Sequence, residues 1–350
     1  MADFDFYATR TLMEGIEQSF SPSTLFRDVF FPNEITFSTK EIDMDYKKGG
    51  RKMAPFVVRG SHGVNIARNS FSTKSYTAPL MKPKIVYTIE DLEKRSFNEA
   101  IYSPKTPAQR MGEMIGKDMA DLIDMNTRRI EWMCAQTLLE GSFCVSGFAD
   151  DGVKEIVDTV NFDWDGKTVY SGEDTWDKET SDIYGHLQDA SRKIRRNCNM
   201  IPTVAIGGAN IFDYMLKNKS IYDKLLVPST SNLSFANFAP KIERSDIIRC
   251  GCLQALNLDF YTYDAIYEND NGKETPYIPD DVLIIGVPYL GRQLYGAISQ
   301  FEDNNIQTYE GKFVPKYSVN AKDDTAELAM STRCVPLPTY IDSWVTLKVK

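Results

Sequence analysis

The chain has 350 residues, of which 42% are hydrophobic and 25% charged, and its net charge is −9. These values are typical of a globular protein with a buried core. The negative charge argues against broad electrostatic affinity for nucleic acid, and the lack of a run of about 18 apolar residues excludes a membrane helix.

The N-terminal 32 residues combine an acidic start with an apolar cluster. Asp3 and Asp5 stand where a secretory signal needs basic and then apolar residues, so we expect a chain that is not exported by the usual route. The apolar cluster consists of Leu25, Phe26, Val29, Phe30 and Phe31. It is too short to be stable alone, so it must dock either on this chain's core or on a neighbouring molecule.

A strand pattern follows, and its period of two changes phase between Phe37 and Ile42, which indicates a bulge or a strong twist. The strand leads into "DYKKGGRKM", and a return segment ends in "KPKIVYT". The tip residues are Lys47, Lys48, Gly49, Gly50, Arg51 and Lys52. Thirteen residues of strand reach about 40 Å, and an isolated two-stranded ribbon is marginal in water. The pattern therefore predicts a long ribbon that needs a partner.

The strongest local signal is a helix over residues 106–141. Thr106 and Gln109 form a capping box, Pro107 occupies the first helical position, and Gly141 ends the run. The predicted buried positions are Met111, Ile115, Met119, Leu122, Asn126, Ile130, Met133 and Thr137. Their spacing of three or four residues is typical of one helical face packed on a core.

The second half mixes strands and helices. Short strands are expected over 142–170, and a helix capped at Thr180 or Ser181 follows. "IPTVAIGG" is typical of a buried strand and leads into a helix over "ANIFDYMLKNKSI". Residues 259–286 read as a β-hairpin with its turn at Asn271-Gly272, and more β structure is expected from about 312 to the end.

No catalytic or cofactor-binding pattern emerges. The turn at Gly207-Gly208 lacks the spacing of a phosphate loop, and "NDNG" lacks the rest of a calcium loop. Six scattered cysteines without a CxxC pair, together with only two histidines, give poor support for a zinc site. We therefore expect no catalytic residues, no cofactor and no metal, and a chain built for association.

Five segments in order resemble the major capsid proteins of tailed bacteriophages, specifically the lambda-type capsid family. The segments are "LFRDVFFPNEITFSTKEIDMD", "APFV" with "KPKIVYT", the helix at 106–141, "DFYTYDAIYENDNGKETPYIPDDVLIIG" and "CVPLPTYIDSWVTLKV". The resemblance implies an α+β protein with the Hong Kong 97-type capsid fold. Its implied parts are an N-terminal arm (1–32), an extended E-loop (33–86), a peripheral domain (87–170) with a spine helix (106–141), an axial domain (171–300) and a return to the peripheral domain (301–350).

The resemblance further implies a major head protein, not an enzyme, that assembles into an icosahedral shell around double-stranded phage DNA. Its implied partners are copies of itself in hexamers and pentamers, a portal protein, and DNA held on the inner face without sequence specificity. Because the arm begins within the first 25 residues, a scaffolding protein is expected to be a separate chain. A decoration protein is left open, and no membrane is involved. Assembly is expected in the host bacterial cytoplasm, and the final location is the virion.

In this family the E-loop lies across a neighbouring subunit on the outer side of the shell. The hypothesis is that the four cations of the tip dock on carboxylates of adjacent subunits while Gly49-Gly50 makes the reversal. Two alternatives for the tip remain: solvated charges that prevent edge aggregation, and contact with DNA. For the whole chain, the alternatives are an encapsulin-like nanocompartment shell and, more distantly, a soluble enzyme with a flexible lid ribbon.

Overall fold

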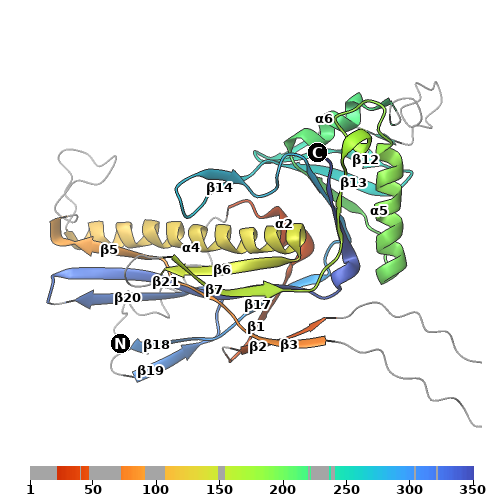
Figure 1. The fold of residues 1–350 in the computed structure, drawn as a ribbon. Coiled ribbons are helices and arrows are strands. Elements are labelled where there is room, and N and C mark those ends of the chain that lie inside the picture. Colours follow the sequence, from red (N-terminus) through yellow and green to blue (C-terminus); the bar gives the residue numbers. More distant parts are fainter. Residues whose placement is uncertain are drawn as a thin grey trace, which may run out of the picture.

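The computed structural model describes residues 22–39, 41–46, 72–90, 107–148, 154–219, 221, 236–237, 241–302, 305–320 and 322–350. They form a mixed α+β fold, as the sequence predicts, with two main sheets (Figure 1). None of the described helices is both long and apolar enough to cross a membrane.

The first region, called the α4 layer, is a long helix lying along a sheet (Figure 1). Its elements are α2 (Leu25–Phe30), β1 (Asn33–Thr36), β4 (Leu80–Met81), β5 (Lys84–Thr88), α4 (Pro107–Glu140), β17 (Gly291–Tyr295), β20 (Val314–Asn320) and β21 (Thr325–Pro338). The strand β21 is the centre of this sheet, because it pairs antiparallel with β17, β20, β4 and β5. The strand β1 adds to the edge, parallel to β17.

The helix α4 confirms the periodicity seen in the sequence. Its described residues are Pro107–Glu140, and the next residue, Gly141, has a φ of 67°, which suits a residue without a Cβ. All eight positions that the sequence predicts to be buried are buried, including the polar Asn126 and Thr137. At the helix end, the Leu138 carbonyl accepts from Trp344 Nε1 at 3.0 Å and Thr346 Oγ1 at 2.7 Å. The C-terminal strand of the chain thus satisfies a carbonyl that the helix leaves open.

The second region, called the α5–α6 layer, is an eight-stranded mixed sheet with two helices packed on one face (Figure 1). Its elements are β8 (Lys167–Val169), α5 (Ile183–Cys198), β9 (Val204–Gly207), α6 (Ala209–Lys217), β10 (Ala236–Asn237), β11 (Lys241–Arg244), β12 (Ile247–Leu253), β13 (Leu258–Tyr263), β16 (Val282–Gly286) and β22 (Trp344–Lys348). Alternate residues of β16 serve two cores: Leu283 and Ile285 face α5 and α6, while Val282 and Ile284 join the core of the α4 layer.

Four two-stranded ribbons complete the described chain. They are β2 (Glu41–Tyr46) with β3 (Ser72–Thr77), β6 (Ser142–Phe148) with β7 (Lys154–Asn161), β14 (Ile266–Glu268) with β15 (Glu274–Pro276), and β18 (Ile298–Glu302) with β19 (Asn305–Tyr309). Two short 3₁₀ turns are also present: Gly172–Asp174 precedes α5, and Ile341–Ser343 precedes β22.

The thirteen-residue strand expected across residues 34–46 is two strands with different partners. The strand β1 pairs with β17 and β2 pairs with β3, so the change of phase in the sequence marks a break rather than a bulge. The predicted ribbon itself is present as β2–β3, with Glu41 opposite Thr77 and Tyr46 opposite Ser72.

The hairpin expected over residues 259–286 is smaller than predicted. Only β14 and β15 pair with each other, and the flanking strands β13 and β16 lie on either side of β9. The expected turn is present, because the Gly272 N–H donates to the Asn269 carbonyl at 2.9 Å and Gly272 has a φ of 73°.

Two helix ends also differ from expectation. The N-cap of α5 is Asp182, which accepts from the Gly185 N–H at 3.2 Å, because its short carboxylate reaches that amide. The helix α6 ends at Lys217, and the buried Asn218 that follows donates to the Ser181 carbonyl at 2.8 Å. That bond to a distant segment competes with continuation of the helix.

Candidate functional site

The predicted docking residues fall into two groups with different outcomes. The tip residues Lys47, Lys48, Gly49, Gly50, Arg51 and Lys52 lie outside the described residues, so their role stays a prediction. The N-terminal residues Leu25, Phe26, Phe30 and Phe31 are described and buried, with Phe26 fully covered. They pack in this chain's own core, which is the first of the two docking alternatives.

Two glycines make room for the aromatic residues of the N-terminal segment. A Cβ at Gly291 would lie 2.3 Å from Phe31 Cδ1, and a Cβ at Gly286 would lie 2.7 Å from Phe30 Cε1. Real Cβ atoms do not come this close to other atoms. The N-terminal segment can therefore pack against β17 and β16 because both strands have glycine at the points of contact.

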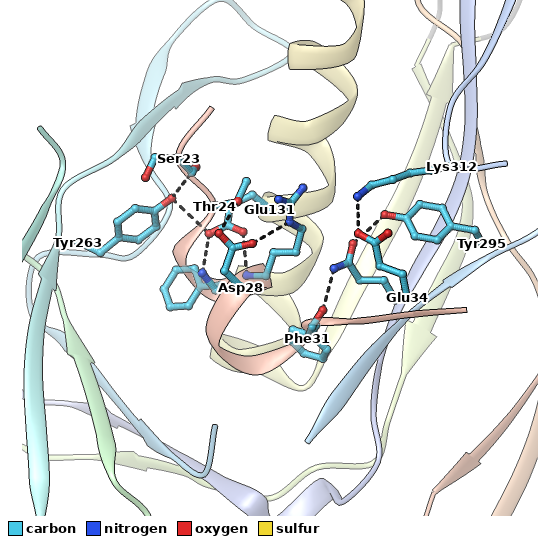
Figure 2. Close-up of polar contacts among 12 residues, drawn as sticks. Ser23, Thr24, Asp28, Phe31, Glu34, Glu131, Tyr263, Tyr295 and Lys312 are labelled. Carbon is cyan, nitrogen blue, oxygen red and sulfur yellow. Dashed lines mark hydrogen bonds and ion pairs between the residues drawn. The ribbon is translucent and has the colours of Figure 1, made fainter. Parts of the chain in front are cut away.

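A buried carboxylate on α4 holds the start of α2 (Figure 2). Glu131 is fully buried and accepts three hydrogen bonds. The Phe26 N–H donates to its Oε1 at 2.8 Å, the Arg27 N–H donates to its Oε2 at 3.0 Å, and the Tyr263 hydroxyl donates to Oε1 at 3.2 Å. The first turn of α2 is therefore capped by a residue more than 100 positions away, while its own N-cap, Thr24, donates to Asp28.

The electrostatics of this carboxylate are unusual. Burial raises the pKa of Glu131 from 4.5 to about 7, although the Phe26 and Arg27 N–H groups act to lower it. The Arg27 guanidinium is paired with Asp28 at 3.1 Å. Burial, and then the charge of Glu131, also raise the pKa of Tyr263.

A second set of contacts holds the segment after α2 (Figure 2). Gln293 is buried and donates through Nε2 to the Phe31 carbonyl at 2.7 Å, while the Tyr295 hydroxyl donates to Gln293 Oε1 at 2.7 Å. Lys312 forms an ion pair with Glu34 on β1. Residues 22–36, called the N-terminal strap, are therefore fixed at both ends.

Sequence reasoning missed Glu131 and Gln293. The available signal for Glu131 was its position between Ile130 and Trp132, in the half of α4 where most side chains are buried. A charged residue in such a run indicates a buried bonding role. Nothing local marks Gln293, because its partner belongs to a segment 262 positions away.

A groove runs beside α4 on the side of β4 and β6. It has a volume of about 680 Å³, continues toward the β14–β15 ribbon, and is bordered by Leu80 and Met125, which are 48% and 51% exposed. The apolar side chains lining it are Leu80, Met81, Met125, Trp132, Met133, Phe143 and Val145. This is an exposed apolar surface of the kind that binds another protein segment.

The described residues give no support for a metal or anion site. They contain no group of three or more His, Cys, Asp or Glu side chains that could hold a metal ion. At the turn from β9 to α6, a Cβ on Gly208 would lie 2.3 Å from the Pro279 carbonyl oxygen, so neighbouring backbone fills the space a ligand would need.

Comparison with known proteins identifies the family. The model of the phage major capsid protein E family matches residues 8–349. The major capsid protein of Escherichia phage lambda is 22% identical over 326 residues, 93% of each chain, and that of Enterobacteria phage P21 is 23% identical over 350 residues, 98% of this chain and 99% of that protein.

Solved structures agree with this match at the level of the fold. A prophage capsid protein from E. coli CFT073 superposes with a TM-score of 0.69 at 19% identity, covering 98% of this chain and 99% of that one. A phage-related protein from Bordetella bronchiseptica RB50 gives 0.52 at 11% identity, over 97% and 96%. The chain therefore belongs to the phage major capsid protein E family.

Proposed function

We propose that copies of this chain assemble into the closed icosahedral shell of a phage head and enclose double-stranded DNA. The observation that carries the proposal is the family match over residues 8–349, which leaves almost no part of the chain outside the capsid family. In this assignment the α4 layer is the peripheral domain and the α5–α6 layer is the axial domain. Hexamers and pentamers of the chain then form the shell.

The geometry of one chain supports a shell made by overlap of neighbours. The ribbon β2–β3 pairs only with itself among the described strands, and such a ribbon is marginal in water without a partner. The groove beside α4 offers an apolar surface to which an extended segment of another copy can bind. We assign this groove to the E-loop of a neighbouring subunit.

The charges at the tip fit the same arrangement. The exposed face of α4 carries the carboxylates Glu113 and Asp121 on either side of Lys117, so a positively charged tip crossing this helix has carboxylate partners within reach. Each exposed ion pair contributes about 0–1 kcal/mol, but the contact repeats at every subunit of a closed shell.

The further partners follow from a role in the head. A portal protein occupies one vertex, a separate scaffolding protein guides assembly in the host bacterial cytoplasm, and DNA contacts the inner face without sequence specificity. A decoration protein would bind the outer surface. The mature protein resides in the virion.

Electron microscopy of the chain expressed with its neighbouring phage genes tests the function. We expect closed shells that hold DNA when packaging proteins are present. Shells that hold an enzyme and no DNA would favour a nanocompartment, and a chain that stays monomeric with scaffold present would contradict the proposal.

Charge reversal tests the tip. Changing Lys47, Lys48, Arg51 and Lys52 together to Glu should reduce the yield of shells, most strongly at low salt where repulsion is less screened. The matched control exchanges lysine for arginine and arginine for lysine at the same four positions, which preserves charge. Equal yields for the two variants at low salt would show that the tip is a solvated turn without a docking role.

A further inference from the structure

The N-terminal strap is held by a carboxylate, Glu131, that forms no ion pair with any of the described residues. Glu131 is the only charged side chain among the fully buried polar groups of the described residues, and the nearest arginine of the strap, Arg27, pairs with Asp28. The strap N–H groups and the charge of Arg27 support the negative charge of Glu131, but burial outweighs them and raises its pKa. Burying an ionised carboxylate under these conditions costs free energy that a neutral carboxyl group does not.

The hydrogen bonds around Glu131 can accommodate both of its protonation states. In the ionised state the Phe26 N–H, the Arg27 N–H and the Tyr263 hydroxyl all donate to it. The Tyr263 hydroxyl also lies 3.3 Å from the Ser23 carbonyl, which is a second acceptor. When Glu131 takes up a proton, its O–H donates to Tyr263 Oη and the tyrosine hydroxyl turns to donate to Ser23.

We propose that Glu131 fastens the N-terminal strap to α4 in a proton-dependent way: the neutral carboxyl group holds the strap firmly, and the ionised carboxylate loosens it. Release of the strap exposes Glu131 to water, where ionisation is unopposed. Attachment and proton uptake at this residue are therefore linked. The proposal concerns a single chain and does not depend on the shell.

The other titratable groups around Glu131 keep their state near neutral pH. Tyr263 on β13, Tyr277 after β15 and Cys134 one turn further along α4 all have raised pKa values, in each case chiefly because they are buried. They therefore remain neutral, and Arg27 forms an ion pair with Asp28 of α2 at 3.1 Å. Glu131 is left as the group whose charge changes.

The direction and size of the effect follow from its pKa. Attachment raises the pKa of Glu131 from 4.5 to about 7, so the attached form binds the extra proton. The stabilisation is complete below 4.5 and is lost as the pH rises through about 7. Between about pH 5 and pH 8 the equilibrium for strap release should rise about 70-fold and then level off.

Hydrogen exchange measured by mass spectrometry on the 350-residue chain tests this. The readout is the opening of amides in residues 22–36, corrected for the intrinsic effect of pH on exchange. We expect the rise of about 70-fold in the wild type between about pH 5 and pH 8, and a change of less than about twofold in Glu131→Gln. The glutamine keeps the size of the side chain and does not titrate, but its single carbonyl oxygen can accept from only one of the two strap N–H groups. The comparison therefore uses the change of opening with pH in each protein and not its absolute level.

The matched control is Glu113→Gln, which makes the same change of charge at an exposed position of α4 and should follow the wild type. A wild-type strap whose corrected opening is flat with pH would overturn the proposal. A Glu131→Gln chain that keeps the full rise would overturn it as well.

Infrared difference spectroscopy of the wild type keeps the proposal testable even when Glu131→Gln fails to fold. A protonated carboxyl group has a carbonyl stretch that the carboxylate lacks. We expect this band to disappear on raising the pH, with a midpoint at about 7. A wild-type chain without a carboxyl band that titrates near neutral pH would contradict the proposal.

Discussion

The α4 layer and the α5–α6 layer are assembled in different ways. All strands of the α5–α6 sheet except β22 come from one stretch of chain, residues 167–286. The α4 layer joins segments from both ends of the chain, because β1, β5, β17 and β21 meet in one sheet. In the first case most of the paired strands come from one continuous stretch of chain, whereas in the second case β1, β4 and β5 pair with strands more than 200 positions away.

The buried polar groups of the two layers bond over different distances along the chain. In the α5–α6 layer, the buried Asn218 donates to the Ser181 carbonyl, 37 positions away. In the α4 layer, buried polar groups bond to the backbone of a distant segment: Asn126 donates to the Met330 carbonyl at 3.2 Å and Gln293 to the Phe31 carbonyl. Glu131 instead accepts, from the Phe26 and Arg27 N–H groups. Apolar contacts are tolerant of register, but a buried polar group is costly when unpaired, so these residues select the correct partner segment.

The largest expected effect is loss of the α4 layer through its helix. Met119→Pro removes a backbone hydrogen bond, clashes with the preceding turn and deletes a buried side chain. The combined cost should be at least about 5 kcal/mol, which is comparable to the stability of a whole domain. Urea unfolding and shell yield measure it.

Met119→Leu is the matched control, since it preserves volume and helix propensity and should cost less than about 1.5 kcal/mol. Shells of normal yield from Met119→Pro would show that α4 does not organise its layer. Loss of both layers together would show that they unfold as one unit.

The next effect is on the strap. Phe26 is fully buried, and its ring packs edge-on against the Tyr263 ring with 5.2 Å between the ring centroids. Phe26→Ala should therefore reduce the free energy of unfolding by about 3–5 kcal/mol. Phe301→Ala is the control, because Phe301 is 70% exposed and its truncation should be nearly silent in the isolated chain. Equal effects of the two substitutions would mean that the strap contributes little to the core.

The sequence predicted those parts of the molecule whose signal is local. The helix α4 follows from the spacing of its apolar residues and from Pro107 and Gly141, and the structure confirms a helix over Pro107–Glu140. The apolar cluster at Leu25, which the sequence indicated was too short to be stable alone, packs in the core of this chain. Both features depend on residues close together in the chain.

The missed features depend on contacts between distant residues. The strand β9 lies between β13 and β16, so two strands that the turn signal had joined are not neighbours. Glu131 caps a helix 105 residues away, and nothing in its own neighbourhood states which segment it will meet. Local propensity cannot encode such a choice, which is set by the packing of the whole layer.

A smaller effect should separate the two layers. Ile194 is fully buried among the apolar residues of the α5–α6 layer, and Ile194→Ala should cost about 2–4 kcal/mol. Because Phe26 belongs to the other core, the double substitution should be additive within about 0.5 kcal/mol. Coupling well above that value, measured by urea unfolding of the four proteins in the cycle, would mean that the layers share one cooperative core.

The smallest expected effect is that of adding reductant, because we expect no disulfide bond in either layer. All six cysteines are free, and Cys134, Cys250 and Cys334 are buried. Burial raises the pKa of each of these three thiols, to about 12 for Cys334, so they stay protonated and unreactive near neutral pH. Non-reducing gels of mature particles should therefore show a monomer-sized band. Cys144 is the exposed thiol, on β6 beside the α4 groove, and it is where a bond between copies would form first. A ladder that disappears with reductant, and that Cys144→Ser abolishes, would show that the α4 layer is held between subunits by a covalent bond that the α5–α6 layer lacks.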